Sequence, residues 1–150
     1  MKNYAAYGSN LNLGQMLYRC PEAKLLGTAW LEDWQLLFKG SKTGSYLTVE
    51  PKKGSRVPLG IWKVNQRDEL NLDWYEGYPN FYQKFEQELD VYLDDGMTKR
   101  MKVFFYAMPT SAKLGIPSKH YLYTCREGYE DFGFDPVYLM KALIASRRNK

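Results

Sequence analysis

Two short segments of the chain carry residue types that could bind and move charge. The first is Tyr7-Gly8-Ser9-Asn10, where a strand-like run ends in glycine and a helical pattern follows at once. Such a turn exposes several backbone N–H groups, which can bind a carboxylate or a developing oxyanion. A tight turn that Ser9 or Asn10 caps explains the same residues without any ligand.

The hydroxyl of Ser9 raises the question of nucleophilic catalysis. A serine nucleophile needs a nearby base and a third group that orients this base. The single histidine, His120, lies far along the chain at the expected start of a helix. We therefore do not expect a serine triad.

The second segment places Glu76 at the expected end of a helix, within the aromatic run of residues 73–82. Negative charge is unfavourable at a helix C-terminus, and apolar walls disfavour the ionised form of a carboxyl. Both effects raise the carboxyl pKa, which suits a general base that works near neutral pH. A surface glutamate beside a glycine turn is the alternative.

Composition excludes several classes of protein. With 150 residues, 45% of them hydrophobic, the chain fits one globular domain over residues 1–150. The net charge of +4 comes with no recognisable nucleic-acid-binding module, so we expect no nucleic-acid partner. No apolar run approaches the length of a membrane span. The two cysteines, Cys20 and Cys125, form no C-x-x-C motif and are expected to be reduced in a cytoplasmic protein.

Cofactor motifs are also missing from the sequence. No group of His, Cys, Asp and Glu has metal-ligand spacing, and no glycine-rich nucleotide-binding motif occurs. We therefore predict neither a metal nor a cofactor.

The elements that must position these residues follow from periodicity and turn signals. Residues 2–7 read as a strand and residues 12–19 as a short helix. The later strands are expected at residues 25–31, 34–39, 45–50, 57–64, 81–93 and 98–107. Helices are expected from Asn65 to about residue 75, from Ser118 to about residue 132, and after Asp135. This order predicts an α+β fold in which a curved sheet closes into a small barrel.

Motifs along nearly the whole chain resemble the gamma-glutamylcyclotransferase family, including its AIG2-like members. Residues 4–11 resemble the family's opening Y-G-S-N strand and loop, and residues 58–64 its mid-chain strand. Residues 72–82 resemble the segment with its catalytic acid, D-x-x-E-G, which tyrosine follows. Residues 117–134 resemble its C-terminal helix, glycine and turn. The resemblance implies a small mixed β-barrel flanked by helices.

The resemblance also implies a reaction and a role for each residue. A small-molecule γ-glutamyl substrate would cyclise to 5-oxoproline and release a free amine, as in glutathione metabolism. By family match, Glu76 would move the proton, and the backbone amides of Gly8, Ser9 and Asn10 would bind the α-carboxylate or the oxyanion. Tyr7 would form pocket wall. Tyr82 and Tyr121 would hydrogen-bond the substrate.

Three questions stay open at this point. The released group could be an amino acid, another amine or an acyl-carrier intermediate. A non-catalytic ligand-binding or regulatory module on the same fold is the alternative from a different class, although the acid at position 76 argues against it. The oligomeric state is undetermined.

Overall fold

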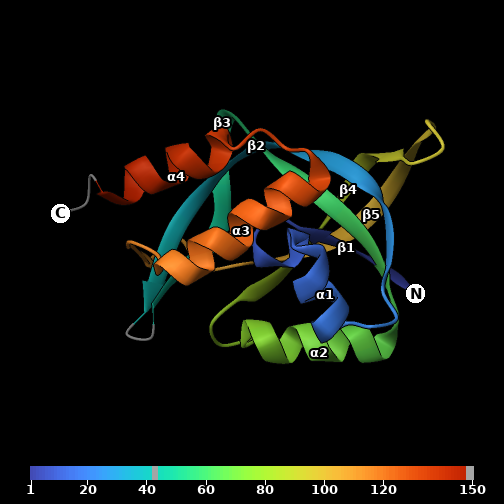
Figure 1. Cartoon of the computed structure of the whole chain (residues 1–150), viewed down its shortest axis with the longest axis horizontal. Coiled ribbons are helices and arrows are strands. Elements are labelled where there is room, and N and C mark those ends of the chain that lie inside the picture. The colour runs from blue at the N-terminus through green and yellow to red at the C-terminus, as the bar shows by residue number, and fades with distance from the viewer. Residues whose placement is uncertain (42–43, 148–150) are drawn as a thin grey trace.

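The strands of the protein form one sheet that closes on itself (Figure 1). The computed structural model of the chain describes residues 1–41 and 44–147. Its strands are β1 (Lys2–Ala6), β2 (Lys24–Ser41), β3 (Gly44–Val64), β4 (Gln83–Leu93), β5 (Thr98–Ala107) and β6 (Lys113–Leu114). The sheet order is β3-β1-β5-β4-β2-β6, and an additional β3–β2 pairing closes five of these strands into a barrel. β1 runs parallel to β5, and β1–β3, β2–β3 and β4–β5 are antiparallel. The predicted small mixed β-barrel is confirmed.

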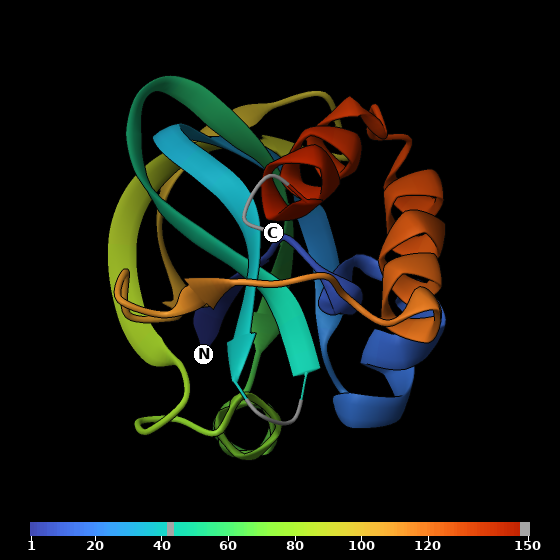
Figure 2. The ribbon, with the colours of Figure 1, turned by 90° about the vertical axis from the view of Figure 1, so that its left-hand side faces the viewer.

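Helical segments pack around this barrel. They are the 3₁₀ turn η1 (Ser9–Leu11), α1 (Leu13–Arg19), α2 (Gln66–Glu76), α3 (Lys119–Phe132) and α4 (Val137–Arg147). α3 contacts η1, α4 contacts β2, and α1 contacts α2. In Figures 1 and 2, α3 therefore lies beside η1 and α1, while α2 and α4 lie at opposite ends of the view. No helix in the described ranges is both long and apolar enough to cross a membrane.

The sequence predicted four separate strands at residues 25–31, 34–39, 45–50 and 57–64. This prediction is wrong, because the structure has two long strands over these residues. The first two merge into β2 and the last two into β3, which together form one long curved hairpin. The pairing register shifts between Glu32 and Trp34, where Asp33 has φ 64°. A bulge of this kind bends a strand without ending it, so the chain turns while the sheet continues.

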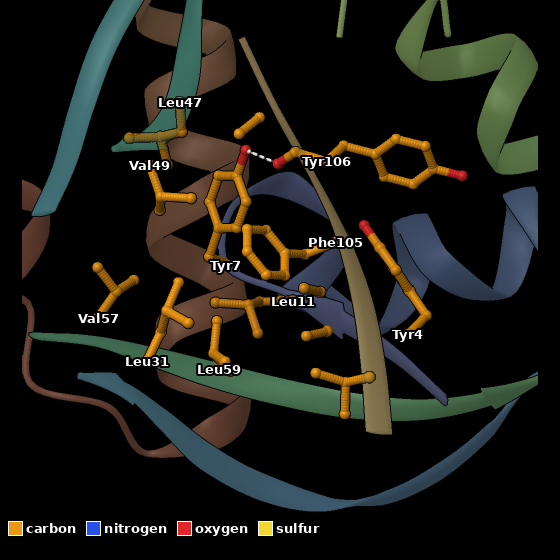
Figure 3. Close-up of a cluster of buried hydrophobic side chains, with 14 of the residues drawn as sticks. Tyr4, Tyr7, Leu11, Leu31, Leu47, Val49, Val57, Leu59, Phe105 and Tyr106 are labelled. Atoms are coloured by element: carbon orange, nitrogen blue, oxygen red, sulfur yellow. Dashed lines mark hydrogen bonds between the residues drawn. The ribbon is translucent and has the colours of Figure 1, made fainter. Parts of the chain in front are cut away.

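Buried side chains fill the barrel and anchor the turn that follows β1. Leu11 of η1 is fully buried, and Figure 3 shows it among Leu59, Tyr7 and Phe105. Complete burial of a leucine side chain contributes about 1.5–3 kcal/mol relative to its exposure. The turn at residues 8–10 is thereby tied to the core of the protein.

The helix ends carry the caps that their sequences predict. Asn65 and Asp68 form a capping box at the start of α2, with Asn65 Oδ1 accepting from Asp68 N at 2.8 Å. Ser118 Oγ accepts from Tyr121 N at 3.1 Å at the start of α3. Gly133 ends α3 with φ 70°, a left-handed conformation that glycine adopts without strain.

Helix α3 comes unusually close to the backbone that follows η1. A Cβ added at Gly128 would lie 2.6 Å from the backbone nitrogen of Asn12. Asn12 Nδ2 donates to the carbonyl of Thr124 at 3.1 Å, and Leu13 N donates to Asp131 Oδ2 at 2.9 Å. α3 therefore holds the start of α1 in place, and Gly128 is the position that allows this approach.

Candidate active site

A cavity of about 370 Å³ opens where η1, β3, α3 and the C-terminal end of α2 meet. The residues that the sequence singles out all line it: Glu76, Tyr7, Gly8, Ser9, Asn10, Tyr82 and Tyr121. The structure therefore brings these residues together from distant parts of the chain, while the role of each stays a prediction. His120 is exposed at the start of α3 and does not line the cavity.

The turn at residues 8–10 lines this cavity. Leu11 N donates to Gly8 O at 3.0 Å and Asn12 N to Ser9 O at 3.1 Å. These bonds leave the N–H groups of residues 8–10 at the open end of the helical turn, where intrahelical acceptors are missing. This geometry suits the binding of an anionic group by main-chain donors.

The side chain of Asn10 fixes the turn and leaves the ligand to the backbone. Asn10 is only 2% exposed. Its Nδ2 donates to the Tyr4 hydroxyl at 3.0 Å, and its Oδ1 accepts from Arg19 Nη1 at 2.8 Å. Both ends of the amide are thus engaged within the protein.

Glu76 is the last residue of α2, and the next residue turns the chain sharply. Gly77 has φ 63°, and its N–H donates to the carbonyl of Trp74 at 3.2 Å. Burial raises the pKa of Glu76 from its ordinary value of 4.5 to about 7, and the positive charge of Arg19 partly opposes this shift. Near neutral pH the carboxyl can therefore both accept and donate a proton.

We expect the Glu76→Gln variant to gain stability over the parent chain as the pH rises. The folded protein holds the Glu76 proton more tightly than the unfolded chain does, so this group lowers the free energy of unfolding between about pH 4.5 and about pH 7. Above that window the cost amounts to roughly 1–2 kcal/mol, because solvent in the cavity screens part of the shift.

Urea unfolding at about pH 5 and about pH 8 measures this difference. Glu127→Gln, which removes an exposed carboxyl from α3, controls for the change in net charge. A Glu76→Gln advantage that is the same at both pH values would contradict the raised pKa.

Two tyrosines hold the strand segment that forms one cavity wall. The Tyr82 hydroxyl donates to the carbonyl of Leu47 at 2.7 Å, and Leu47 N donates to the Tyr121 hydroxyl at 3.0 Å. Burial raises the pKa of Tyr82 and of Tyr121 well above the ordinary value, so both stay protonated near neutral pH. The Tyr82 hydroxyl already donates its proton to the carbonyl of Leu47. Its oxygen can therefore act only as a hydrogen-bond acceptor for a ligand.

A chain of hydrogen bonds joins the barrel to α2. The Tyr7 hydroxyl donates to the carbonyl of Tyr106 at 2.6 Å (Figure 3). The Tyr106 hydroxyl donates to Asp73 Oδ1 at 2.6 Å, and Lys84 Nζ lies 2.8 Å from the same oxygen. Asp73 stands one turn before Glu76, so this network fixes the end of α2 that carries the acid.

Several lining residues were not singled out by the sequence. They are Tyr4, Arg19, Tyr46, Leu47, Trp74, Tyr75, Gly77, Phe81 and Tyr106. Arg19 differs most from the others because it brings a full positive charge to the cavity. A cation at the end of a short helix is ordinarily explained by the helix dipole, so its sequence position carried no signal of a site. In the described part of the chain, no group of three or more His, Cys, Asp or Glu residues could hold a metal ion.

Comparison with known proteins finds similarity to one family. A family model described as "Gamma-glutamyl cyclotransferase, AIG2-like" matches residues 4–123. The chain is 36% identical over 81 residues to the human protein "Gamma-glutamylcyclotransferase", which is 49% of this chain and 43% of that protein. It is 30% identical over 76 residues to "Gamma-glutamylaminecyclotransferase B" of Danio rerio, which is 51% of this chain and 40% of that protein. Each match spans less than half the length of the relative.

Solved structures share the fold over most of their length. A structure named "Gamma-glutamyl cyclotransferase" matches with a TM-score of 0.80 and 28% identity, over 94% of this chain and 85% of that chain. An uncharacterized human protein matches with a TM-score of 0.76, 28% identity and the same coverage. An AIG2-like protein from mouse matches with a TM-score of 0.57 and 21% identity over 82% of this chain and 83% of that chain, which supports the fold alone.

Proposed function

The chain belongs to the gamma-glutamyl cyclotransferase, AIG2-like family, and we propose that it converts a γ-glutamyl compound into 5-oxoproline and a free amine, with Glu76 as general acid and base. The observation that supports this most is the shared cavity. It is lined both by a carboxyl whose pKa is raised to about 7 and by the main-chain turn at residues 7–10.

The reaction needs little beyond orientation and one proton carrier. The α-amine of the substrate attacks the γ-carbonyl carbon of the same molecule, so ring closure is intramolecular and positioning supplies much of the rate. Glu76 takes a proton from the α-ammonium group before the attack and gives a proton to the leaving nitrogen when the γ-amide bond breaks. The second proton that the ring nitrogen loses converts the departing amine into its ammonium form. Atoms balance without water, because the two products together contain all atoms of the substrate.

The other predicted site residues complete this proposal. The amides of Gly8, Ser9 and Asn10 bind the α-carboxylate or the oxyanion that forms on the γ-carbonyl oxygen. Tyr7 forms pocket wall, and its hydroxyl is engaged with Tyr106. Tyr82 and Tyr121, which both bond the backbone of Leu47 in β3, contact the substrate. Because the donors of the turn are backbone groups, its side chains serve mainly to shape it.

An assay of 5-oxoproline release from a panel of γ-glutamyl compounds tests the proposal. The panel pairs γ-glutamyl amino acids with γ-glutamyl amines. One relative is named a gamma-glutamylcyclotransferase and the other a gamma-glutamylaminecyclotransferase, so both kinds of compound are included. We expect 5-oxoproline and free amine to appear in equal amounts. The matched α-glutamyl dipeptides should release no amine, because their amide bond lies on the wrong carbonyl.

Failure of the whole panel would contradict catalysis. Binding of γ-glutamyl compounds without any product would instead support the ligand-binding alternative.

A further inference from the structure

We propose that Arg19 is a specificity-determining residue whose guanidinium binds a carboxylate on the departing amine. On this basis γ-glutamyl amino acids are better substrates than γ-glutamyl amines that lack such a carboxylate. The inference rests on the proposed cyclotransferase function of the same cavity. It adds the chemical class of the amine that is joined to the γ-carbonyl of the substrate and released in the reaction.

The guanidinium of Arg19 is held in one place at the cavity wall. Its Nη1 donates to Asn10 Oδ1 at 2.8 Å and to Ser9 Oγ at 3.3 Å. Its central carbon lies 4.6 Å from the ring centroid of Tyr75, which is a cation–π contact. The backbone carbonyl of Arg19 accepts from Asn71 Nδ2 at 3.1 Å. The side chain is therefore oriented before any ligand arrives.

Arg19 has bonding capacity that the protein itself does not use. Its Nε is buried and has no hydrogen-bond partner among the residues that the structure describes. Within those same residues no carboxylate forms an ion pair with it, Glu76 included. A planar guanidinium with donors to spare matches the two oxygens of a carboxylate.

The depth of the cavity indicates which substrate carboxylate reaches Arg19. Tyr7 and Tyr82 are only 7% and 5% exposed, so they line the closed part. Tyr75, on which Arg19 stacks, is 41% exposed, and its neighbour Trp74 is 77% exposed. The departing amine must leave through the open side, whereas ring closure is best protected in the closed part. Arg19 therefore lies between the turn, which it bonds through Nη1, and the open side, where its guanidinium stacks on Tyr75 and the leaving group departs.

Charge also favours this assignment. Every γ-glutamyl compound carries the α-carboxylate, and the backbone amides of the turn are suited to this group. A second anion, on the departing amine, would meet the one guanidinium among the described lining residues. Uncharged amines would leave the guanidinium of Arg19 without an anionic partner, which makes their binding less favourable.

Two substrates that differ only in this charge provide the test: γ-L-glutamyl-L-alanine and γ-L-glutamyl-L-alaninamide. We expect the parent protein to show a kcat/KM for the acid that is about 10–100-fold higher than for the amide. Arg19→Gln should remove most of this preference by lowering the value for the acid much more than the value for the amide, while the loss of its bond to Asn10 Oδ1 lowers both values alike. Arg19→Lys, which keeps a point charge without the planar fork, should retain part of the preference.

Calorimetry separates binding from turnover and from folding. The two compounds are titrated into Glu76→Gln and into Glu76→Gln combined with Arg19→Gln, and the same loss of preference is expected in Kd. Thermal unfolding of each variant checks the fold, and Arg126→Gln on the exposed face of α3 controls for net charge.

Three other outcomes would contradict either the role of Arg19 or the proposed function. An equal loss for acid and amide in Arg19→Gln would assign Arg19 to the glutamyl half or to the turn, and a parent protein without preference would also overturn the inference. If no compound is turned over, the proposed function fails, and the Kd ratios still decide the role of Arg19.

Discussion

Replacement of Glu76 by Gln is expected to lower the rate of 5-oxoproline release by about 10²–10⁴-fold, the range typical for loss of a general acid or base. Gln has nearly the same shape as Glu but can neither accept nor deliver the proton. Because the turn at residues 8–10 and the tyrosines stay in place, substrate binding should change little. Steady-state rates on the best substrate of the panel, with Kd from calorimetry, measure both effects.

A matched carboxyl elsewhere separates chemistry from charge. Glu127→Gln removes an exposed carboxyl from α3 and should leave the rate unchanged within about twofold. Normal turnover by Glu76→Gln would show that another group moves the proton. Loss of both turnover and binding would instead assign Glu76 to the shape of the cavity.

Gly128→Ala is expected to destabilise the protein by about 1–3 kcal/mol and to lower the rate as well. The new Cβ would lie 2.6 Å from the backbone nitrogen of Asn12, so either α3 or the η1–α1 segment must move. Residues 8–10 lie just before this contact in the chain. A small displacement of the groups that orient the substrate can lower the reaction rate by a large factor. Thermal unfolding and kcat/KM measure the two effects on one preparation.

The adjacent surface of α3 supplies the control for this change. Arg126→Ala also introduces alanine into α3 but at an exposed position, and it should leave both quantities nearly unchanged. A Gly128→Ala protein with parental stability and rate would show that α3 tolerates a shift, and that the turn is held by other contacts.

Local chemistry made the helix ends predictable. The cap formed by Asn65, the N-cap at Ser118 and the left-handed glycine at Gly133 each depend on a few neighbouring residues. The structure confirms the expected helix starts at Asn65 and Ser118.

The course of the long hairpin could not be predicted in the same way. The break between residues 31 and 34 looks like the end of a strand in the sequence. Whether Asp33 ends a strand or forms a bulge depends on the facing strand, since β3 continues the pairing on both sides of it. Pairing across a hairpin is a tertiary property, and local hydrophobic alternation does not contain it.

Some of the lining residues and the raised pKa of Glu76 were predictable from the sequence, but the placement of Arg19 was not. Glu76 and the turn carry motifs of their own, so the sequence points to both. Arg19 faces the cavity only because α1 packs beside α2, where Tyr75 receives its guanidinium. The unpaired Nε arises from this packing and therefore could not be predicted from residue types.

The first strand has a consequence for the order of events during synthesis. β1 lies between β3 and β5, and the bond from Tyr7 to Tyr106 joins residues 99 positions apart. The ribosome releases β1 long before its parallel neighbour β5 has been made. The turn after β1 waits with it. The nascent protein therefore acquires its pocket late, when the barrel closes.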